Sequence, residues 1–488
     1  MIVYDILCVS VFLHSTNDRH ARTFYRKCIS RFFVTQESLF KKIYGRAPKV
    51  YAAFVMLLIS QAKGWRKENM FTQINNFITW FDGVVWGLPL IILILITGFL
   101  LTVRLGFLQV RHLGKALKFM VKNEEGGEGE VTSFGALCTA LSATIGTGNI
   151  VGVATAIAAG GPGALFWMIA AAFFGAGVGL FGIGTFTQVN GIASAVKNFF
   201  DPDTVHTVSL FGNTYSWATV IACLILTLCV GLVVLGGIQR IAKVSQIIVP
   251  FMAVLYVALA LIIVITNITA VPGAIATIVK TAFNGSALAG GAMGTMVVAM
   301  QKGIARGIFS NESGLGSAPI AAAAAQTKEP VRQGLVSMTG TFIDTIVICT
   351  MTGLSIVITE TWNTGLEGVA ITTAAFQKGL PFPAQFASFA LMLCLVFFAF
   401  TTILGWDYYG ERCLEYLFNR NMTAVKTYRW LYIICVFFGP YMTVAAVWNI
   451  ADIFNALMAF PNLIALLALS GVVVKETKDF FKKHKNYE

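Results

Sequence analysis

Long apolar runs recur along the chain, and they limit what it can fold into. A helix needs about 20 mostly apolar residues to cross the hydrocarbon core of a bilayer. Runs of this kind occupy residues 85–103, 135–160, 162–196, 215–237, 241–266, 289–309, 333–358, 384–405, 430–449 and 453–474. With 57% hydrophobic and 12% charged residues and a mean hydropathy of +0.75, the chain is far more apolar than a soluble domain. The sequence predicts an all-α polytopic membrane protein.

The positive charge of the chain indicates its membrane topology. The formal net charge is +12, and the positions of the basic residues decide what that charge means. Lys and Arg gather in alternate loops, at residues 104–122, 240–243, 328–332, 412–429 and 475–485. This alternation is what the positive-inside rule expects of cytoplasmic loops. We therefore assign these loops to the cytoplasm and predict the lipid bilayer, not a nucleic acid, as the partner.

Residues 1–69 do not fit this topology. The segment is basic, yet the first span must run inward if the loop at 104–122 is cytoplasmic, which leaves the segment on the opposite side. Its apolar stretch at 51–62 is too short to span, and the segment lacks the features of a signal peptide. We interpret 1–69 as a basic N-terminal extension from an over-extended reading frame, and 70–488 as the transmembrane domain. A genuine extra segment is the alternative.

The stretch 161–198 presents a conflict between length and topology. The loop charges place both of its ends outside, so the chain must enter the membrane and return. Its 38 residues make roughly 57 Å of helix at about 1.5 Å per residue, less than two crossings of about 30 Å and a turn. Two explanations stay open: a shallow hairpin that turns at the glycines of 175–184, or a loss of residues relative to a working ancestor.

Two apolar runs are interrupted by glycines and polar residues. The first interruption is GTGN at 146–149, and the second is RGIFSNESGLGS at 306–317. Unwinding a helix in lipid leaves backbone groups without partners, so such a break persists only where substrate, ion or protein supplies them. Each break opens a set of five elements, ending near 266 and near 474, and the loop charges give the two sets opposite orientations. Broken helices at matching positions of inverted repeats are typical of the binding site of a secondary transporter.

The chemistry of a broken helix suits a zwitterion. A half-helix N-terminus offers free N–H groups and a positive dipole end to a carboxylate. The released carbonyls suit Na⁺ or an ammonium group. The sequence contains no Walker, Rossmann, HExxH or nucleophile-elbow motif, so nothing in it indicates ATP-driven transport or catalysis. We predict that the protein is not an enzyme.

Four ionisable residues lie in or beside the apolar runs: Lys302, Arg306, Glu312 and Asp344. Charges inside a membrane are costly, so each is a candidate functional residue. For Glu312 we expect pairing with Arg306, or with a backbone donor, that holds the second break in shape. A gating or proton-carrying role is the alternative, and Asp344 has the same two interpretations.

Four segments resemble the alanine or glycine:cation symporter family, also called sodium:alanine symporters. They are GALCTALSATIGTGNIVGVATAIAAGGPGALFWM, GIARGIFSNESGLGSAPIAAAAAQTKEPVRQGL, FTTILGWDYYGERCLEYLF and PNLIALLALSGVVVKETKD. The likeness extends from about Trp86 to Asp479. It implies a leading helix followed by a LeuT-like inverted repeat of five plus five transmembrane elements with two broken helices. It also implies uptake of alanine or glycine by alternating access at the plasma membrane, with Na⁺ as the coupling ion and no other cofactor.

The resemblance further implies the residues of the site. The substrate contacts fall on the two breaks, on the third core helix and on two aromatic walls: Thr147, Gly148, Asn149, Gln188, Phe309, Ser310, Asn311, Gly314 and Trp406. The Na⁺ ligands implied are carbonyls near Ala143 and Gly146 and the hydroxyls of Thr401 and Thr402, and such oxygens suit a hard cation. For Gln188, a hydrogen bond to another helix is the alternative role.

The chain departs from the family between the second and third core helices. The family usually has a charged cytoplasmic stretch and fuller helices there, whereas here AAFFGAGVGLFGIG runs straight on. Three alternatives therefore stay open beside Na⁺ symport. They are an inactive homologue damaged in these two helices, a proton-coupled symporter, and an ion channel, for which the spans are too apolar to line a polar pore.

Overall fold

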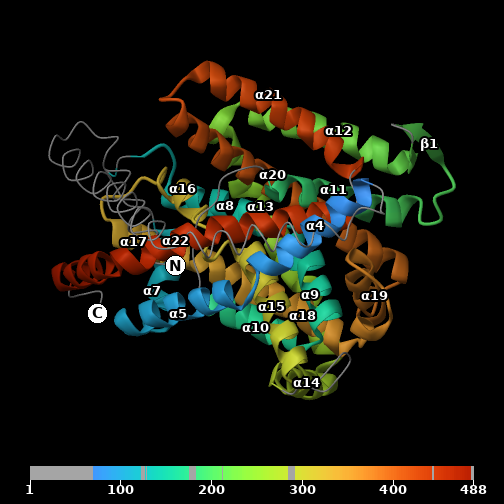
Figure 1. The fold of residues 1–488 in the computed structure, drawn as a ribbon, viewed down its shortest axis with the longest axis horizontal. Coiled ribbons are helices and arrows are strands. Elements are labelled where there is room, and N and C mark those ends of the chain that lie inside the picture. Colours follow the sequence, from blue (N-terminus) through green and yellow to red (C-terminus); the bar gives the residue numbers. More distant parts are fainter. Residues whose placement is uncertain are drawn as a thin grey trace.

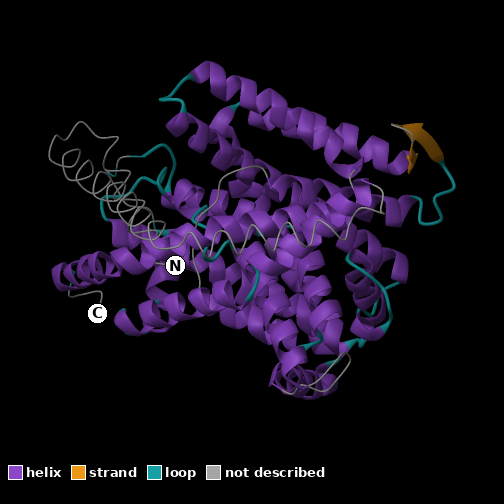
Figure 2. Cartoon of the chain, viewed as in Figure 1, coloured by secondary structure: helices purple, strands orange, loops and turns teal. Residues whose placement is uncertain are grey.

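A computed structural model of the chain describes residues 70–122, 127, 129–174, 183–210, 213–283, 292–441 and 444–484. The extension 1–69 lies outside the described residues, and the domain division at residue 70 stays a prediction. Figure 2 shows that the described part is almost entirely helical. The exception is a hairpin in which β1 (Thr207–Leu210) pairs antiparallel with β2 (Asn213–Ser216). A mostly helical chain agrees with the predicted class of polytopic membrane protein.

The second break divides the helices into two groups along the chain. The first group is α4 (Met70–Val85), α5 (Leu88–Arg104), α6 (Leu108–Arg111), α7 (Leu113–Val121), α8 (Ser133–Thr144), η1 (Gly148–Gly152), α9 (Val153–Gly160), α10 (Gly163–Phe174), α11 (Ile183–Phe200), α12 (Trp217–Val234), α13 (Gly237–Thr266), η2 (Ile268–Ala270), α14 (Val271–Phe283) and α15 (Ala292–Asn311). The second is α16 (Ala318–Ala322), α17 (Pro330–Thr341), η3 (Phe342–Cys349), α18 (Thr350–Ile358), η4 (Thr361–Asn363), α19 (Val369–Gly379), α20 (Ala384–Leu417), α21 (Met422–Phe438), η5 (Gly439–Tyr441) and α22 (Val444–Lys483).

Six helical runs of the described chain are long and apolar enough to cross a membrane. They are Ile78–Arg104, Trp217–Val234, Gly237–Thr266, Pro330–Ile358, Ala384–Leu417 and Val447–Lys483. The bent pair Ser133–Thr144 and Gly148–Gly160 makes a seventh when it is taken as one span. On α12, large apolar side chains such as Leu228 face outward, which is how a helix contacts lipid.

The core of the protein lies where α8, α13 and α20 meet. In Figure 1, α12 and α21 lie side by side along one edge of this bundle. Tyr256 of α13 is fully buried, and its ring centroid lies 5.2 Å from that of Phe398 on α20. A Cβ on Gly405 would come within 2.7 Å of the Ala143 backbone nitrogen. Gly405 therefore lets α20 pack directly against α8, the helix that leads into the first break.

The last two spans differ from their predicted limits. The sequence predicted 430–449 and 453–474, but α21 ends at Phe438 and α22 runs unbroken from Val444. The hydropathy pattern missed the start of α21 because that end carries Arg429, which pairs with Glu411 of α20. The 3₁₀ turn η5 (Gly439–Tyr441) follows α21, and Trp448 and Asp452 lie in the first turns of α22.

The stretch 161–198 contains two described helices. Of its two helices, α10 holds 12 residues and α11 holds 18. Residues 175–182 between them lie outside the described part of the chain, so these lengths do not decide between the two explanations. Most of the expected turn at 175–184 lies outside the described residues.

Candidate functional site

The first break separates α8 from α9, whose axes differ by 50°. Two side chains satisfy the backbone groups that the break releases. Asn149 accepts a hydrogen bond from the Gly146 N–H at 2.8 Å, and Gln188 of α11 accepts one from the Thr147 N–H at 2.7 Å. Such partners are what an unwound segment needs in a membrane. The predicted residues Thr147, Asn149 and Gln188 therefore meet, and Gln188 makes the interhelical bond that was its alternative role.

The second break follows α15. Gly314 and Gly316 adopt φ angles of +102° and +83°, a backbone region that glycine occupies without steric cost. Asn311 accepts a hydrogen bond from the Ser313 N–H at 2.8 Å, which turns the chain out of the helix. The structure thus has a turn where the sequence predicted an interruption.

The expected pair between Glu312 and Arg306 is wrong. The Glu312 carboxylate accepts a hydrogen bond from the Ser317 hydroxyl, whereas Arg306 pairs with Asp452 at 2.6 Å. Glu312 lies beyond the end of α15 with a φ angle of +54°, so its side chain does not follow the helical spacing from Arg306. Glu312 holds the second break in shape, as expected, but through Ser317.

The two breaks lie directly against each other. A Cβ on Gly148 would lie 3.0 Å from Ser310 Cα and 3.1 Å from Phe309 Cδ1. Carbon atoms in contact normally lie about 3.5–4.0 Å apart. A larger residue at position 148 therefore requires the second break to shift by a few tenths of an ångström. The predicted residues Gly148, Phe309 and Ser310 form one contact surface in the middle of the bundle.

Asp344 joins the breaks from a third helix. Asn149 donates to its Oδ1 at 2.7 Å, and Ser310 donates to its Oδ2 at 2.9 Å. Thr345 also donates to Oδ2, at 2.7 Å, and receives a bond from Asn311 at 2.9 Å. The sequence flagged Asp344 as a candidate but did not place it in the site, because nothing in its spacing reveals partners on two other helices.

Asp344 lies on the π-helix η3 and is fully buried. Among the described residues, no Lys, Arg or His forms an ion pair with it. A π-helical turn often marks a functional position, and a buried carboxylate in a membrane helix is a functional candidate by default. We therefore include Asp344 in the candidate site.

The residues predicted for Na⁺ divide into two groups. Thr402 donates a hydrogen bond to the Ile145 carbonyl at 3.1 Å, and a Cβ on Gly146 would collide with the Thr402 hydroxyl. Thr402 thus faces the first break, and α20 also packs on Ala143. Thr401 lies 3.5 Å from the sulfur of Met252 on α13 and donates to the Phe398 carbonyl at 3.0 Å. No described contact joins Thr401 to the break, and the Na⁺ role of all four residues stays a prediction.

The aromatic partner of Phe309 is Trp448. Their ring centroids lie 4.9 Å apart, and the Arg306 guanidinium lies 4.3 Å from the Trp448 ring. Trp406 is buried with its ring centroid 5.9 Å from that of Tyr409, one turn after Thr402 on α20. The sequence missed Trp448 because it placed that residue at the end of a span instead of the start of α22.

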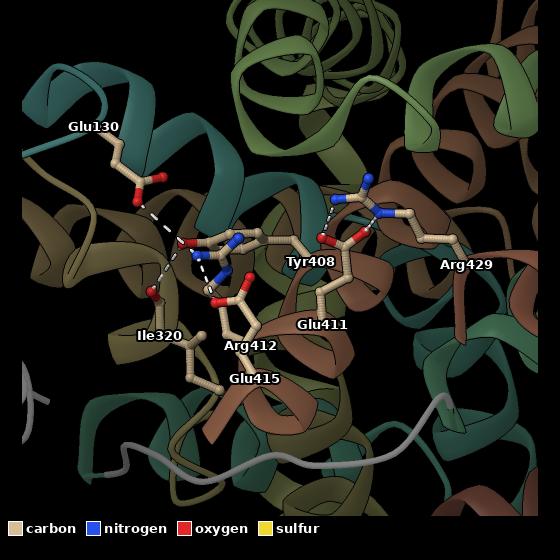
Figure 3. Close-up of polar contacts among 7 residues, drawn as sticks. All are labelled: Glu130, Ile320, Tyr408, Glu411, Arg412, Glu415 and Arg429. Carbon is tan, nitrogen blue, oxygen red and sulfur yellow. Dashed lines mark hydrogen bonds and ion pairs between the residues drawn. The ribbon is translucent and has the colours of Figure 1, made fainter. Parts of the chain in front are cut away.

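Polar contacts tie the C-terminal half of α20 to its neighbours (Figure 3). Glu411 accepts two hydrogen bonds from Arg429 of α21, one of them at 2.8 Å. The Tyr408 hydroxyl donates to the Ile320 carbonyl of α16 at 3.5 Å. Arg412 lies 3.0 Å from Glu415 and 3.9 Å from Glu130, ahead of α8. This network connects α20 to the segments that flank both breaks on the side assigned to the cytoplasm.

The broken helices, their contact and the apolar spans are the features of a transporter. The model of the sodium:alanine symporter family matches residues 71–181 and 176–488. The chain belongs to this family. Members of the sodium:alanine symporter family carry amino acids together with a cation, so this member is a multi-pass amino-acid–cation symporter and not an enzyme. The predicted family and general activity are confirmed.

Curated relatives match this symporter along nearly their whole length. An uncharacterized transporter of Haemophilus influenzae is 48% identical, over 84% of this chain and 97% of the relative. The sodium/alanine symporter AgcS of Methanococcus maripaludis is 42% identical, over 83% and 97%. The amino-acid carrier protein AlsT of Bacillus subtilis is 33% identical, over 86% and 94%.

The family match also bears on the short stretch at 161–198. Its two segments meet at 176–181, between α10 and α11. The alignment with AgcS extends over 462 positions but uses only 83% of this 488-residue chain. Several tens of aligned positions therefore have no counterpart here. The family match is divided at this stretch, and both explanations stay open.

Proposed function

We propose that the protein is a Na⁺-coupled symporter of alanine or glycine in the plasma membrane, which works by alternating access around the two breaks. The contact of Gly148 with Ser310 and Phe309 carries this proposal, because it brings the start of η1 at the first break against the end of α15 at the second. Backbone N–H groups, carbonyls and hydroxyls converge there, and these are the groups that hold a zwitterion and a cation.

The substrate carboxylate binds at Thr147 in this account. The Thr147 N–H donates a hydrogen bond to the Gln188 side-chain oxygen. In this account the substrate carboxylate replaces that oxygen as the acceptor. The Thr147 hydroxyl is buried, and no described group bonds it. It is therefore a second donor for the carboxylate, while carbonyls released at the second break receive the ammonium group.

The close contact at Gly148 limits the size of the substrate. With Phe309 beside the break and Trp448 behind it, little room remains for a side chain, which favours alanine and glycine. Contacts to the backbone groups that all amino acids share cannot distinguish one substrate from another. The apolar volume around the substrate side chain does so, and such discrimination is worth about 1–3 kcal/mol per methylene. Asn311 and Gly314 shape the second break, and Trp406 forms the wall on the α20 side.

The cation site lies beside the substrate in this account. The Thr402 hydroxyl lies against the first break at the Ile145 carbonyl, which supports this location. Carbonyls near Ala143 and Gly146 are the other ligands, and Thr401 completes the set after a change of rotamer. The order of the helices supports the five-plus-five arrangement. α8 with α9, α10, α11, α12 and α13 make the first set, and α15 with α16, α17 with α18, α20, α21 and α22 make the second.

Uptake of radiolabelled alanine into vesicles tests this function. We expect an inward Na⁺ gradient to drive accumulation and a proton gradient in Na⁺-free buffer to drive little. Equal uptake under the proton gradient would overturn the cation assignment. If neither gradient drives uptake, the chain is an inactive homologue whose damage lies between α10 and α11.

A further inference from the structure

A polar pocket lies between α4, α15 and α22, on the outer side of the site. Its volume is about 80 Å³, and its polar lining is Asp82, Trp86, Gln301, Lys302, Arg306 and Asp452. A cavity of this size holds several waters or one small ligand. It opens to the outer face because α5 runs from this end to Arg104, in a loop assigned to the cytoplasm.

The pocket combines two carboxylates with two basic side chains. Arg306 and Asp452 pair at 2.6 Å, and Trp86 donates its indole N–H to the Asp452 carbonyl at 2.9 Å. Asp82 is only 9% exposed, and its Oδ1 has no hydrogen-bond partner among the described residues. A buried carboxylate oxygen without a donor is unfavourable. The pocket therefore presents an acceptor to a ligand, with the partly exposed Lys302 in the same wall.

The pocket is connected to the substrate site through aromatic rings. Arg306 pairs with Asp452 on one side and covers Trp448 at 4.3 Å on the other. Trp448 in turn contacts Phe309, which lies against Gly148 at the first break. One layer of aromatic side chains thus separates the outer pocket from the two breaks.

We propose that this outer pocket is a second binding site for the substrate zwitterion, in which Asp82 binds the ammonium group and Lys302 binds the carboxylate. The inference rests on the proposed function, because it takes the same amino acid as its ligand. A zwitterion fits better than a lone cation or anion, since opposite charges face one small space. Arg306 links the pocket to the aromatic layer, so release of its pair with Asp452 lets Trp448 and Phe309 move aside and admits the substrate.

Protection of an introduced cysteine tests the pocket without requiring transport. Gly83 lines the pocket, and a Cβ there would meet no atom within 4 Å. In a chain without its native cysteines, Gly83→Cys is treated from outside with a membrane-impermeant thiol reagent. We expect alanine to slow the modification severalfold, and ethylamine or propionate, each with one of the two charges, to have little effect. Ser209→Cys, on the exposed hairpin, is the control that reacts equally with and without alanine.

Two further variants separate this pocket from the central site. With Asp82→Asn added, Gly83→Cys is expected to lose its protection by alanine. With Gly148→Val added, which obstructs the central site, protection is expected to persist. Loss of protection with Gly148→Val would overturn the second site while leaving the proposed function intact. Full protection by Na⁺ alone, or none by alanine, would overturn it as well.

Discussion

Replacing Gly148 by alanine tests the contact between the two breaks. The added Cβ would lie 3.0 Å from Ser310 Cα, 3.1 Å from Phe309 Cδ1 and 3.2 Å from Ser310 Cβ. Carbon contacts are optimal at about 3.5–4.0 Å, so the second break must shift by roughly half an ångström. One of its closest neighbours is a backbone atom, which cannot rotate away as the end of a flexible side chain can.

The expected cost follows from this crowding. Overpacking a close contact costs about 1–3 kcal/mol, which is about 5–150-fold in affinity at 1.4 kcal/mol per factor of ten. We expect Gly148→Ala to weaken Na⁺-dependent alanine binding by an amount in this range. Gly148→Val places two more methyl groups in the same space, so it is expected to abolish binding.

Gly152 provides a matched control in the same π-helix. A Cβ there would lie 3.8 Å from its nearest neighbours, an ordinary contact distance. We expect Gly152→Ala to bind alanine as the unmodified protein does. Binding is measured on purified protein with labelled alanine, and thermal unfolding is followed in parallel to exclude misfolding. If Gly148→Ala and Gly152→Ala bind alanine equally well, the breaks do not form the site in the way described.

Three other changes have defined outcomes. Phe309→Ala is expected to weaken alanine transport and admit leucine or methionine, with shifts on the order of 1–3 kcal/mol in competition assays; an unchanged ranking of competitors would contradict the lid role. Glu411→Gln leaves Arg429 without its charged partner and is expected to cost on the order of 3 kcal/mol in thermal unfolding; an unchanged midpoint would contradict it. The Ser216 hydroxyl, with the Val205 N–H, holds the pKa of Asp201 below its usual value, so its stabilisation is present above about pH 4 and lost as the pH falls through the lowered pKa. The protection factors of the hairpin amides, which are corrected for the intrinsic exchange rate at each pH, should therefore fall in acid, and not in Asp201→Asn.

The sequence revealed the two breaks because glycines and polar groups interrupt apolar helices there. Both turns appear where they were expected, and Thr147, Asn149 and Gln188 meet at the first. These features depend on local composition, which a sequence displays directly. The contact between the two breaks at Gly148 and Ser310 agrees with a shared site. The distance between the breaks could not be predicted from the spacing of residues along the sequence.

The sequence could not show which distant side chains complete the site. Asp344 bonds Asn149 and Ser310, which lie 195 and 34 residues away along the chain. The sequence did not place Trp448 near the start of α22, because hydropathy does not locate a helix boundary within a continuous apolar stretch. The predicted pairing of Arg306 with Glu312 was wrong because Glu312 lies past the end of α15 in the left-handed backbone region, which the sequence does not show.

Equilibrium binding of labelled alanine to the purified protein, with and without Na⁺, tests the central claim most directly. It needs no transport cycle, so its result does not depend on whether the stretch 161–198 allows transport. We predict saturable alanine binding that requires Na⁺, with Thr402→Val weakening the Na⁺ dependence and Gly148→Val eliminating binding. Alanine binding that is indifferent to Na⁺, or that survives Gly148→Val, would contradict a Na⁺-coupled site at the two breaks.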